Sequence, residues 1–175
     1  MRNGLLFILL LTALACKRYK DPAPFTDSRI KNKYCNDPAA INYNWDFPGI
    51  PDNSVCIYPA QIYQGSYFYR DSIFNAAGTL LAQDSFNISI IQIDSTHLTI
   101  SGFCDTTKYT ARATRYYTFT LDSLLGNGQL YCNNKDTIAG KGIKNGIGDT
   151  SFLKLIYTLQ TDTGVSYHSG TATKF

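Results

Sequence analysis

Apolar and polar residues alternate with a period of two along much of the chain after Gln61, and this feature restricts the fold more than any other. In Phe86–Ile90 and in Leu153–Leu159 every second residue is large and apolar, so these side chains would share one face of a strand. Turn-forming residues separate the segments. The pattern predicts about seven or eight antiparallel strands in a meander. The strands predicted from the pattern are Gly65–Phe74, Thr79–Ile93, His97–Cys104, Lys108–Leu121, Gln129–Asn133, Ser151–Gln160 and Val165–Phe175.

The composition supports an all-β fold. All 13 acidic residues are aspartate, and Thr, Ser, Tyr, Ile and Asn are abundant. These residues favour strands and turns rather than helices. Short links between the strands favour either a small closed barrel or a sandwich, because both protect the strand edges. The pattern leaves both architectures open.

The N-terminus has the order of regions found in an export signal. Arg2 precedes an apolar run from Leu5 to Leu14, and small residues lead to Cys16. The run has about ten residues, roughly half of the ~20 that a membrane-spanning helix needs. The segment Ala13-Leu14-Ala15-Cys16 resembles the lipobox of bacterial lipoproteins, with Ala13 at the place where that family usually carries Leu.

The lipobox resemblance implies that residues 1–15 are removed and that Cys16 is lipidated, which anchors the chain in a membrane. Lys17 follows the cysteine. It replaces the aspartate that commonly retains lipoproteins at the inner membrane, so the resemblance implies the outer membrane of the cell envelope. Which leaflet carries the protein stays open.

The cysteine count fits this interpretation. There are five cysteines, and an odd number in an exported chain leaves one unpaired. Lipidation of Cys16 accounts for the odd one. The other four allow three connectivities, of which pairing between neighbours is the preferred one, Cys35 with Cys56 and Cys104 with Cys132.

The chain divides into a tether at residues 16–34, a disulfide loop at 35–58 and a β domain at 59–175. The segment from Cys35 to Asn44 resembles a short Cys-x-Asp-Pro-x-Ala-x-Asn-Tyr-Asn repeat of exported Bacteroidota proteins, which implies a disulfide and that bacterial group. We expect Tyr43 and Trp45 to fold over the bridge. The alternative is a calcium site formed by carboxylates. Its candidate ligands are Asp37, Asp46 and Asp52.

No catalytic or metal-binding pattern stands out. His97 and His168 lie on different predicted strands without a third ligand at metal spacing, so we expect half-exposed strand histidines, no cofactor, no metal and no enzymatic activity. The net charge of +3 is far from that of a nucleic-acid-binding protein.

Aromatic and basic residues are the weak candidates for binding. Rings at Tyr67, Tyr69 and Tyr117 can stack on a ligand, although a β core would use the same residues. Lys141 and Lys144 lie in a glycine-rich segment, Gly140–Gly148, which we expect to be a mobile hairpin loop that contacts a partner.

Several Asp-Ser and Asp-Thr triplets resemble the O-glycosylation motif of Bacteroidota. The candidate acceptors are Ser72, Ser95, Thr106, Ser123 and Thr137. The alternative is local, because Asp, Ser and Thr cap turns through the backbone.

The β domain is similar to the small lipocalin-like domains of Bacteroidota lipoproteins, with Gly65-Ser66-Tyr67 in place of an opening Gly-x-Trp. This resemblance implies a barrel with a small apolar interior. The expected function is that of a lipid-anchored, non-enzymatic module that binds a small apolar ligand, a glycan or another envelope protein. The alternatives are a structural lipoprotein with a filled core and, less favoured, a hydrolase.

Overall fold

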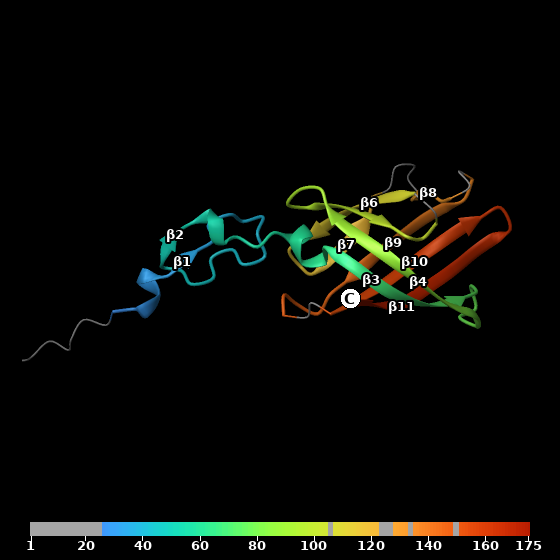
Figure 1. The fold of residues 1–175 in the computed structure, drawn as a ribbon, viewed down its shortest axis with the longest axis horizontal. Helices are drawn as coiled ribbons and strands as arrows, with labels where there is room; N and C mark the ends of the chain where they lie inside the picture. Colours follow the sequence, from blue (N-terminus) through green and yellow to red (C-terminus); the bar gives the residue numbers. More distant parts are fainter. Residues whose placement is uncertain (1–25, 105–106, 123–127, 133–134, 149–150) are drawn as a thin grey trace, which may run out of the picture.

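A computed structural model describes residues 26–104, 107–122, 128–132, 135–148 and 151–175. These residues form a small disulfide-linked module followed by a β-barrel (Figure 1). The predicted signal peptide, the lipidation site Cys16 and most of the predicted tether lie outside the described residues. Within the described part of the chain, no helix combines the length and the apolarity needed to cross a bilayer.

The described residues of the β domain form a closed antiparallel barrel of eight strands. The order around the barrel is β3-β4-β5-β6-β7-β9-β10-β11, and β11 pairs with β3 to close it. A short additional strand, β8, pairs with β9 beyond the end of β7. The bounds are β3 Gly65–Phe74, β4 Leu80–Gln92, β5 His97–Ser101, β6 Lys108–Thr114, β7 Thr118–Leu121, β8 Gln129–Leu130, β9 Thr137–Ile143, β10 Phe152–Thr161 and β11 Gly164–Lys174. The all-β prediction is confirmed, with a barrel rather than a sandwich.

The period-two pattern determines which side chains fill the barrel. Tyr67, Tyr69 and Asp71 of β3 are buried, whereas the intervening Phe68 and Arg70 are exposed. Inward residues of the other strands complete one continuous core, because successive side chains of a strand point to opposite faces. Among them are Ile88, Ile90, Leu98, Ile100, Tyr109, Ala111, Phe119, Ile138, Leu153, Leu155 and Ala172.

Two expectations about strands were wrong. The predicted strand Lys108–Leu121 is divided into β6 and β7 by a tight turn, in which Tyr117 has a φ of 59°. The predicted loop Gly140–Gly148 instead begins inside β9. A Cβ atom at Gly142 would collide with the ring of Phe119. A glycine is therefore needed at this position because an inward-facing ring occupies the space of its side chain, and not because the segment is a mobile loop.

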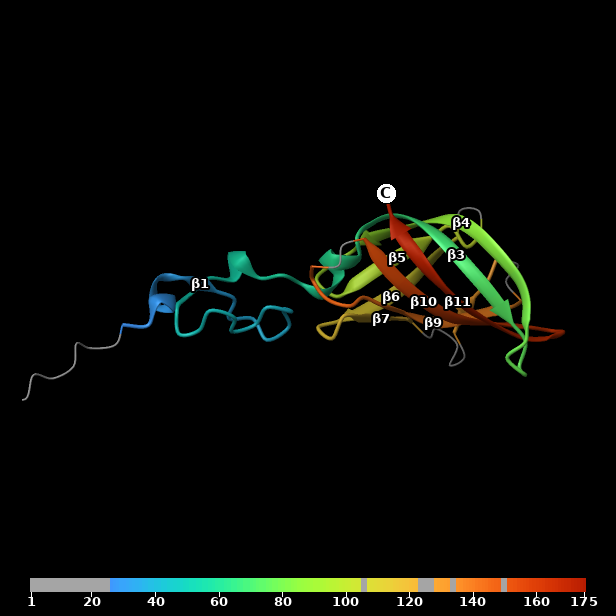
Figure 2. The same cartoon turned by 90° about the horizontal axis from the view of Figure 1, so that it is seen from below.

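A 3₁₀ helix, η3 (Pro59–Tyr63), closes the barrel end at which β3 begins, called here the proximal end (Figure 2). The helix packs against β4 and β6 and buries Ala60 and Tyr63. The Ala60 N–H donates to the Ser95 carbonyl in the β4–β5 turn. At the opposite, distal end lie the β3–β4 and β10–β11 hairpins.

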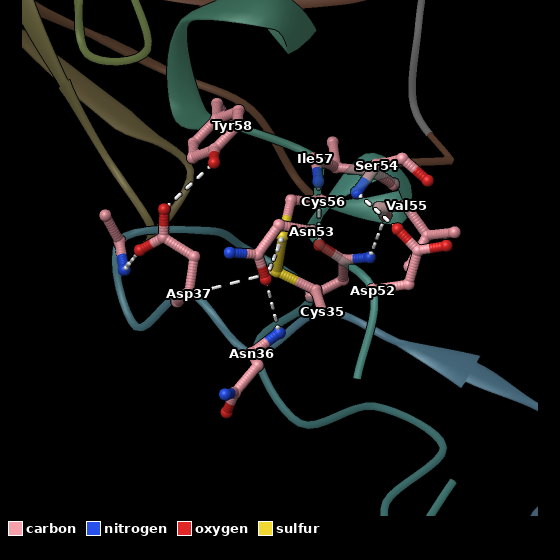
Figure 3. The surroundings of a disulfide bond; sticks show 12 residues. Cys35, Asn36, Asp37, Asp52, Asn53, Ser54, Val55, Cys56, Ile57 and Tyr58 are labelled. Atoms are coloured by element: carbon pink, nitrogen blue, oxygen red, sulfur yellow. Dashed lines mark hydrogen bonds between the residues drawn. A yellow bond between two sulfur atoms is a disulfide. The ribbon is translucent and has the colours of Figure 1, made fainter. Parts of the chain in front are cut away.

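The disulfide module precedes η3 and projects from the proximal end of the barrel (Figures 1 and 2). Its elements are η1 (Ser28–Lys31), β1 (Lys33–Tyr34), β2 (Ile50–Pro51) and η2 (Asn53–Val55). Cys35 and Cys56 form the bridge that holds this loop, as Figure 3 shows. Arg115 of the β6–β7 turn donates to the Pro38 carbonyl and connects the module to the barrel.

Candidate functional site

A buried carboxylate lies in the distal half of the barrel. Asp71 of β3 accepts hydrogen bonds from the Tyr69 hydroxyl at 2.9 Å, the Tyr157 hydroxyl at 2.8 Å and His168 Nδ1 at 2.6 Å. Burial raises the pKa of the Asp71 carboxyl, but the hydrogen bonds from His168, Tyr157 and Tyr69 outweigh that effect and bring the pKa below its ordinary value. The carboxylate is therefore ionised, and both of its oxygens accept hydrogen bonds from the core.

The buried carboxylate continues into a chain of hydrogen bonds that reaches the barrel rim. His168 Nε2 lies 3.0 Å from Ser166 Oγ, and both side chains point inward because they are two residues apart on β11. The His168 ring stacks on Tyr157 with centroids 4.3 Å apart. Ser166, His168 and Asp71 therefore form a Ser–His–Asp arrangement next to the β10–β11 turn.

Sequence reasoning singled out only one of the three residues in this Ser–His–Asp hydrogen-bond network. His168 was singled out but expected to be half-exposed, whereas it is buried. Asp71 and Ser166 were missed as inward-facing residues. A signal existed for Asp71, since it occupies the next inward position after Tyr67 and Tyr69. A charged residue at such a position is rarely buried unless it is paired.

Aromatic rings fill the distal interior around this network. Phe103, from the β5–β6 connection, contacts Phe86 at 5.8 Å, Tyr109 at 5.7 Å and Tyr157 at 5.1 Å between centroids. The neighbouring disulfide Cys104–Cys132 fixes this connection to the segment after β8. A small hollow lined by Phe103, Tyr157 and neighbouring residues measures about 10 Å³, which is room for at most a single water molecule.

Among the described residues, one buried polar side-chain atom of the proximal interior has no hydrogen-bond partner. Tyr63 of η3 is fully buried and meets the edge of Phe119 at 5.0 Å between centroids. Its hydroxyl has no hydrogen-bond partner among the described residues. Burial raises the pKa of this phenol, so the group stays neutral. Close by, the Tyr67 hydroxyl donates to the Tyr63 carbonyl.

The outer face of β3 and β4 has a polar hollow of about 520 Å³. The Arg70 guanidinium lies over the Phe68 ring at 5.5 Å. In the strand register, Arg70 is opposite Ser85 and Ser72 is opposite Gln83. The hollow therefore extends along β3 and β4 from the Phe68 ring and the Arg70 guanidinium to the Ser72 hydroxyl and the Gln83 amide. The residues that line the hollow are Phe68, Arg70, Asp71, Ser72, Gln83, Asp84 and Ser85.

A second outer hollow, of about 360 Å³, crosses β7, β9 and β10. Its lining includes Thr120, Ala139, Lys141, Ile156 and Thr158. Apolar atoms dominate this surface, and Lys141 is the member that the sequence had singled out.

The structure separates the predicted binding residues instead of gathering them. Tyr67 and Tyr69 are fully buried in the core. Tyr117 lies in the β6–β7 turn, where its carbonyl accepts from the Lys144 N–H. Lys144 is buried at the proximal end with its Nζ 5.9 Å from the centre of the Tyr67 ring, whereas Lys141 is exposed on β9.

The O-glycosylation candidates are equally scattered. Ser72 lies on the outer face of β3, opposite Gln83 and Ser169. Ser95 lies in the β4–β5 turn, and Thr137 is the first residue of β9. Thr106 and Ser123 lie outside the described residues.

The remaining polar candidates serve local structure. His97 Nδ1 lies 2.7 Å from Asp94 in the same turn. Asp37 accepts from the Tyr58 hydroxyl, as Figure 3 shows, and Asp52 pairs with Lys33. In the part of the chain that the structure describes, no three His, Cys, Asp or Glu side chains are grouped to hold a metal ion. Trp45, expected to cover the Cys35–Cys56 bridge, is about half exposed.

No protein-family model and no curated protein matches the sequence. The solved structures that are similar to it include the following three. A redesigned β-barrel has 14% identity and a TM-score of 0.42, with 67% of this chain and 95% of that chain covered. A Nostoc punctiforme protein of unknown function from the DUF3598 family has 13% identity and a TM-score of 0.43, with 66% and 49% covered. Lipocalin 12 from rat epididymis has 15% identity and a TM-score of 0.43, with 67% and 69% covered.

Proposed function

We propose that this protein is a lipid-anchored, non-enzymatic module of the bacterial cell envelope that binds a glycan on the outer face of β3 and β4. The observation that carries the binding proposal is the hollow around Phe68 and Arg70. Its volume of about 520 Å³ falls in the roughly 300–1,000 Å³ range of small-ligand sites.

The chemistry of the hollow matches a sugar. The apolar face of a sugar ring stacks on an aromatic ring, and sugar hydroxyls need both donors and acceptors. Phe68 and the Arg70 guanidinium stacked on it offer a flat surface with donors, and Gln83, Ser72 and Ser85 offer both kinds of group. The backbone beneath these side chains is held by pairing of β3 with β4 and β11, so binding would order side chains rather than backbone.

The filled interior supports an outer site rather than an inner one. A ligand that entered past Phe103 would have to displace rings that already contact one another. It would also have to break into a carboxylate network in which Asp71 already accepts three hydrogen bonds. The second outer hollow, at Lys141, lacks a comparable set of polar groups.

The experiment is a glycan array, followed by isothermal titration calorimetry with the best-bound oligosaccharide. Phe68→Ala and Arg70→Ala should each weaken binding about tenfold or more, since loss of about 1.4 kcal/mol is a tenfold change. Phe152→Ala is the matched control, because Phe152 is an exposed phenylalanine on β10, away from the hollow. If Phe68→Ala and Arg70→Ala bound the oligosaccharide as tightly as Phe152→Ala and the wild type, this result would refute the site.

The membrane anchor is tested separately. Cys16→Ser removes the sulfur to which the lipid would be attached. The variant should move from the membrane fraction to the soluble fraction of cells that express it. A Cys16→Ser protein that still fractionates with membranes after a carbonate wash would contradict the anchor.

One observation favours a second candidate, an esterase-type hydrolase. Ser166, His168 and Asp71 have the connectivity of a catalytic triad. In that case Ser166 Oγ attacks an ester carbonyl carbon while its proton passes to His168 Nε2. The alcohol leaves with that proton as its C–O bond breaks. Water then attacks the acyl-serine carbonyl, the bond from that carbon to Ser166 Oγ breaks, the carboxylic acid leaves, and the Ser166 hydroxyl is restored.

A fluorophosphonate probe distinguishes the two candidates. A hydrolase would be labelled on Ser166, and Ser166→Ala would abolish labelling. Ser169→Ala would keep it, because Ser169 lies on the same strand but on the outer face, opposite Ser72. Absence of labelling in the wild-type chain would refute the hydrolase and leave the binding module.

A further inference from the structure

The disulfide module displays four large apolar side chains to solvent. Ile30 is 49% exposed, Trp45 52%, Phe47 55% and Ile50 54%. Each such side chain is unremarkable alone. All four, however, occur within the short segment from Ile30 to Ile50, in which few residues are buried.

Backbone hydrogen bonds fix the segment that carries Trp45 and Phe47. The Asn44 N–H donates to the Cys35 carbonyl, the Phe47 N–H to Asn44 and the Gly49 N–H to Asp46. Asn44 and Asp46 adopt φ values of 58° and 65°, a region that Asn and Asp occupy more readily than other side chains. The segment that carries Trp45 and Phe47 is therefore a defined series of turns.

The second segment meets the first through its backbone. A Cβ atom added to Gly49 would collide with the carbonyl oxygens of Arg29 and Asn32. The Ile50 N–H donates to that same Asn32 carbonyl at 2.7 Å. The backbones that carry Ile30 and Ile50 are thus in direct contact. We refer to the exposed side chains of Ile30, Trp45, Phe47 and Ile50 together as the apolar surface of the module.

The position of this surface restricts what can cover it. In both views the described chain begins at the end of the module that lies away from the barrel (Figures 1 and 2). From Cys16 to Thr26 there are ten peptide steps, which span at most about 35 Å. A lipid on Cys16 would therefore hold the start of the module within about 35 Å of the bilayer, so the module is the part of the described chain nearest to the anchor.

We propose that the apolar surface of the module inserts into the interfacial layer of the membrane and forms a second membrane contact beside the lipid. Tryptophan and other amphipathic aromatic residues favour that layer. The proximity argument rests on the proposed lipidation of Cys16. Residues 26–58 carry three Lys or Arg and four Asp, so insertion depends on apolar contact rather than on anionic lipids.

The chain offers a built-in probe, because Trp45 is its sole tryptophan. The experiment uses the mature chain, residues 16–175 with Cys16→Ser, and vesicles of zwitterionic phosphatidylcholine. We expect the Trp45 emission maximum to shift to shorter wavelength. We also expect phospholipids brominated near the headgroup to quench it more strongly than those brominated deep in the acyl chain.

A matched pair of variants tests which residues insert. Phe47→Ser should lower the vesicle partition coefficient about tenfold, as expected for loss of one buried phenylalanine. Ile50→Ser should act in the same direction and guards against a folding artefact at Phe47, whose ring contacts Tyr34. Phe175→Ser should have no effect, because Phe175 is an exposed phenylalanine at the end of the barrel domain.

Two results would overturn the proposal. One is an emission maximum that does not respond to saturating vesicles. The other is a shift that follows protein concentration without lipid, which would assign the surface to a second copy of the chain. Either result leaves the lipid anchor intact if the lipidated wild-type chain still floats with vesicles. If that chain does not float, the proposed anchor itself fails.

Discussion

Two buried tyrosines provide a sharp test of how the core is stabilised, because the same chemical change at each should have opposite effects. Tyr157→Phe removes a hydroxyl that donates to the ionised Asp71 at 2.8 Å. Hydrogen bonds to charged groups contribute about 1.5–3 kcal/mol. Asp71 keeps its bonds from Tyr69 and His168, so we expect a loss of about 2 kcal/mol in the free energy of unfolding.

Tyr63→Phe removes a hydroxyl that has no partner among the described residues. A buried donor without a partner costs about 1–3 kcal/mol in desolvation, and phenylalanine keeps the ring contact with Phe119. We therefore expect Tyr63→Phe to raise the free energy of unfolding by about 1 kcal/mol. The two variants should differ by about 3 kcal/mol.

The assay is urea unfolding of the unlipidated mature chain, followed by far-ultraviolet circular dichroism. A change in midpoint at constant slope reports stability rather than a change in compactness. If Tyr63→Phe destabilised the barrel as much as Tyr157→Phe, the Tyr63 hydroxyl would have a partner in solution. The predicted difference in stability between the two variants would then be wrong.

Three further predictions concern the same barrel. Because the pKa of Asp71 is lowered on folding, its contribution to stability should be present above its unfolded pKa and lost as the pH falls through the folded value. The stability gap between wild type and Asp71→Asn in urea titrations should therefore narrow below about pH 4. Replacing Cys104 and Cys132 by Ala removes a disulfide between residues 28 positions apart. We expect this change to lower the free energy of unfolding by about 3–4 kcal/mol. Equal urea midpoints for the variant and the wild type would contradict this expectation. Gly142→Ala should lower the free energy of unfolding by about 1–3 kcal/mol, because the added methyl group overpacks against Phe119. An unchanged thermal midpoint would show that the ring moves aside without an energetic penalty.

Local patterns predicted the strands well where the alternation is uninterrupted. The predicted strand Gly65–Phe74 coincides with β3, and Ser151–Gln160 differs from β10 by one residue at each end. The prediction was wrong between Lys108 and Leu121, because the turn at Tyr117 requires a positive φ. Tyrosine is not a usual residue for that conformation, so no turn signal was visible.

The glycines of β9 show a related difficulty. Clustered glycines and lysines indicate a loop when only composition is considered. Gly142 nevertheless lies inside a strand, because the ring of Phe119 occupies the space that a side chain would need. This steric requirement comes from Phe119 on another strand, so the sequence around Gly142 does not reveal it.

The sequence by itself determined most of the strand content, which side chains share a face of a strand, and the preferred cysteine pairs, because periodicity and short spacing are local properties. Only the tertiary structure decided the closure of β11 on β3 and the meeting of Asp71 with His168, 97 residues further along the chain. It also decided that Phe68 and Arg70 share an outer hollow with Gln83 and Ser85. These contacts depend on the register between strands, which is fixed by the packing of the whole core.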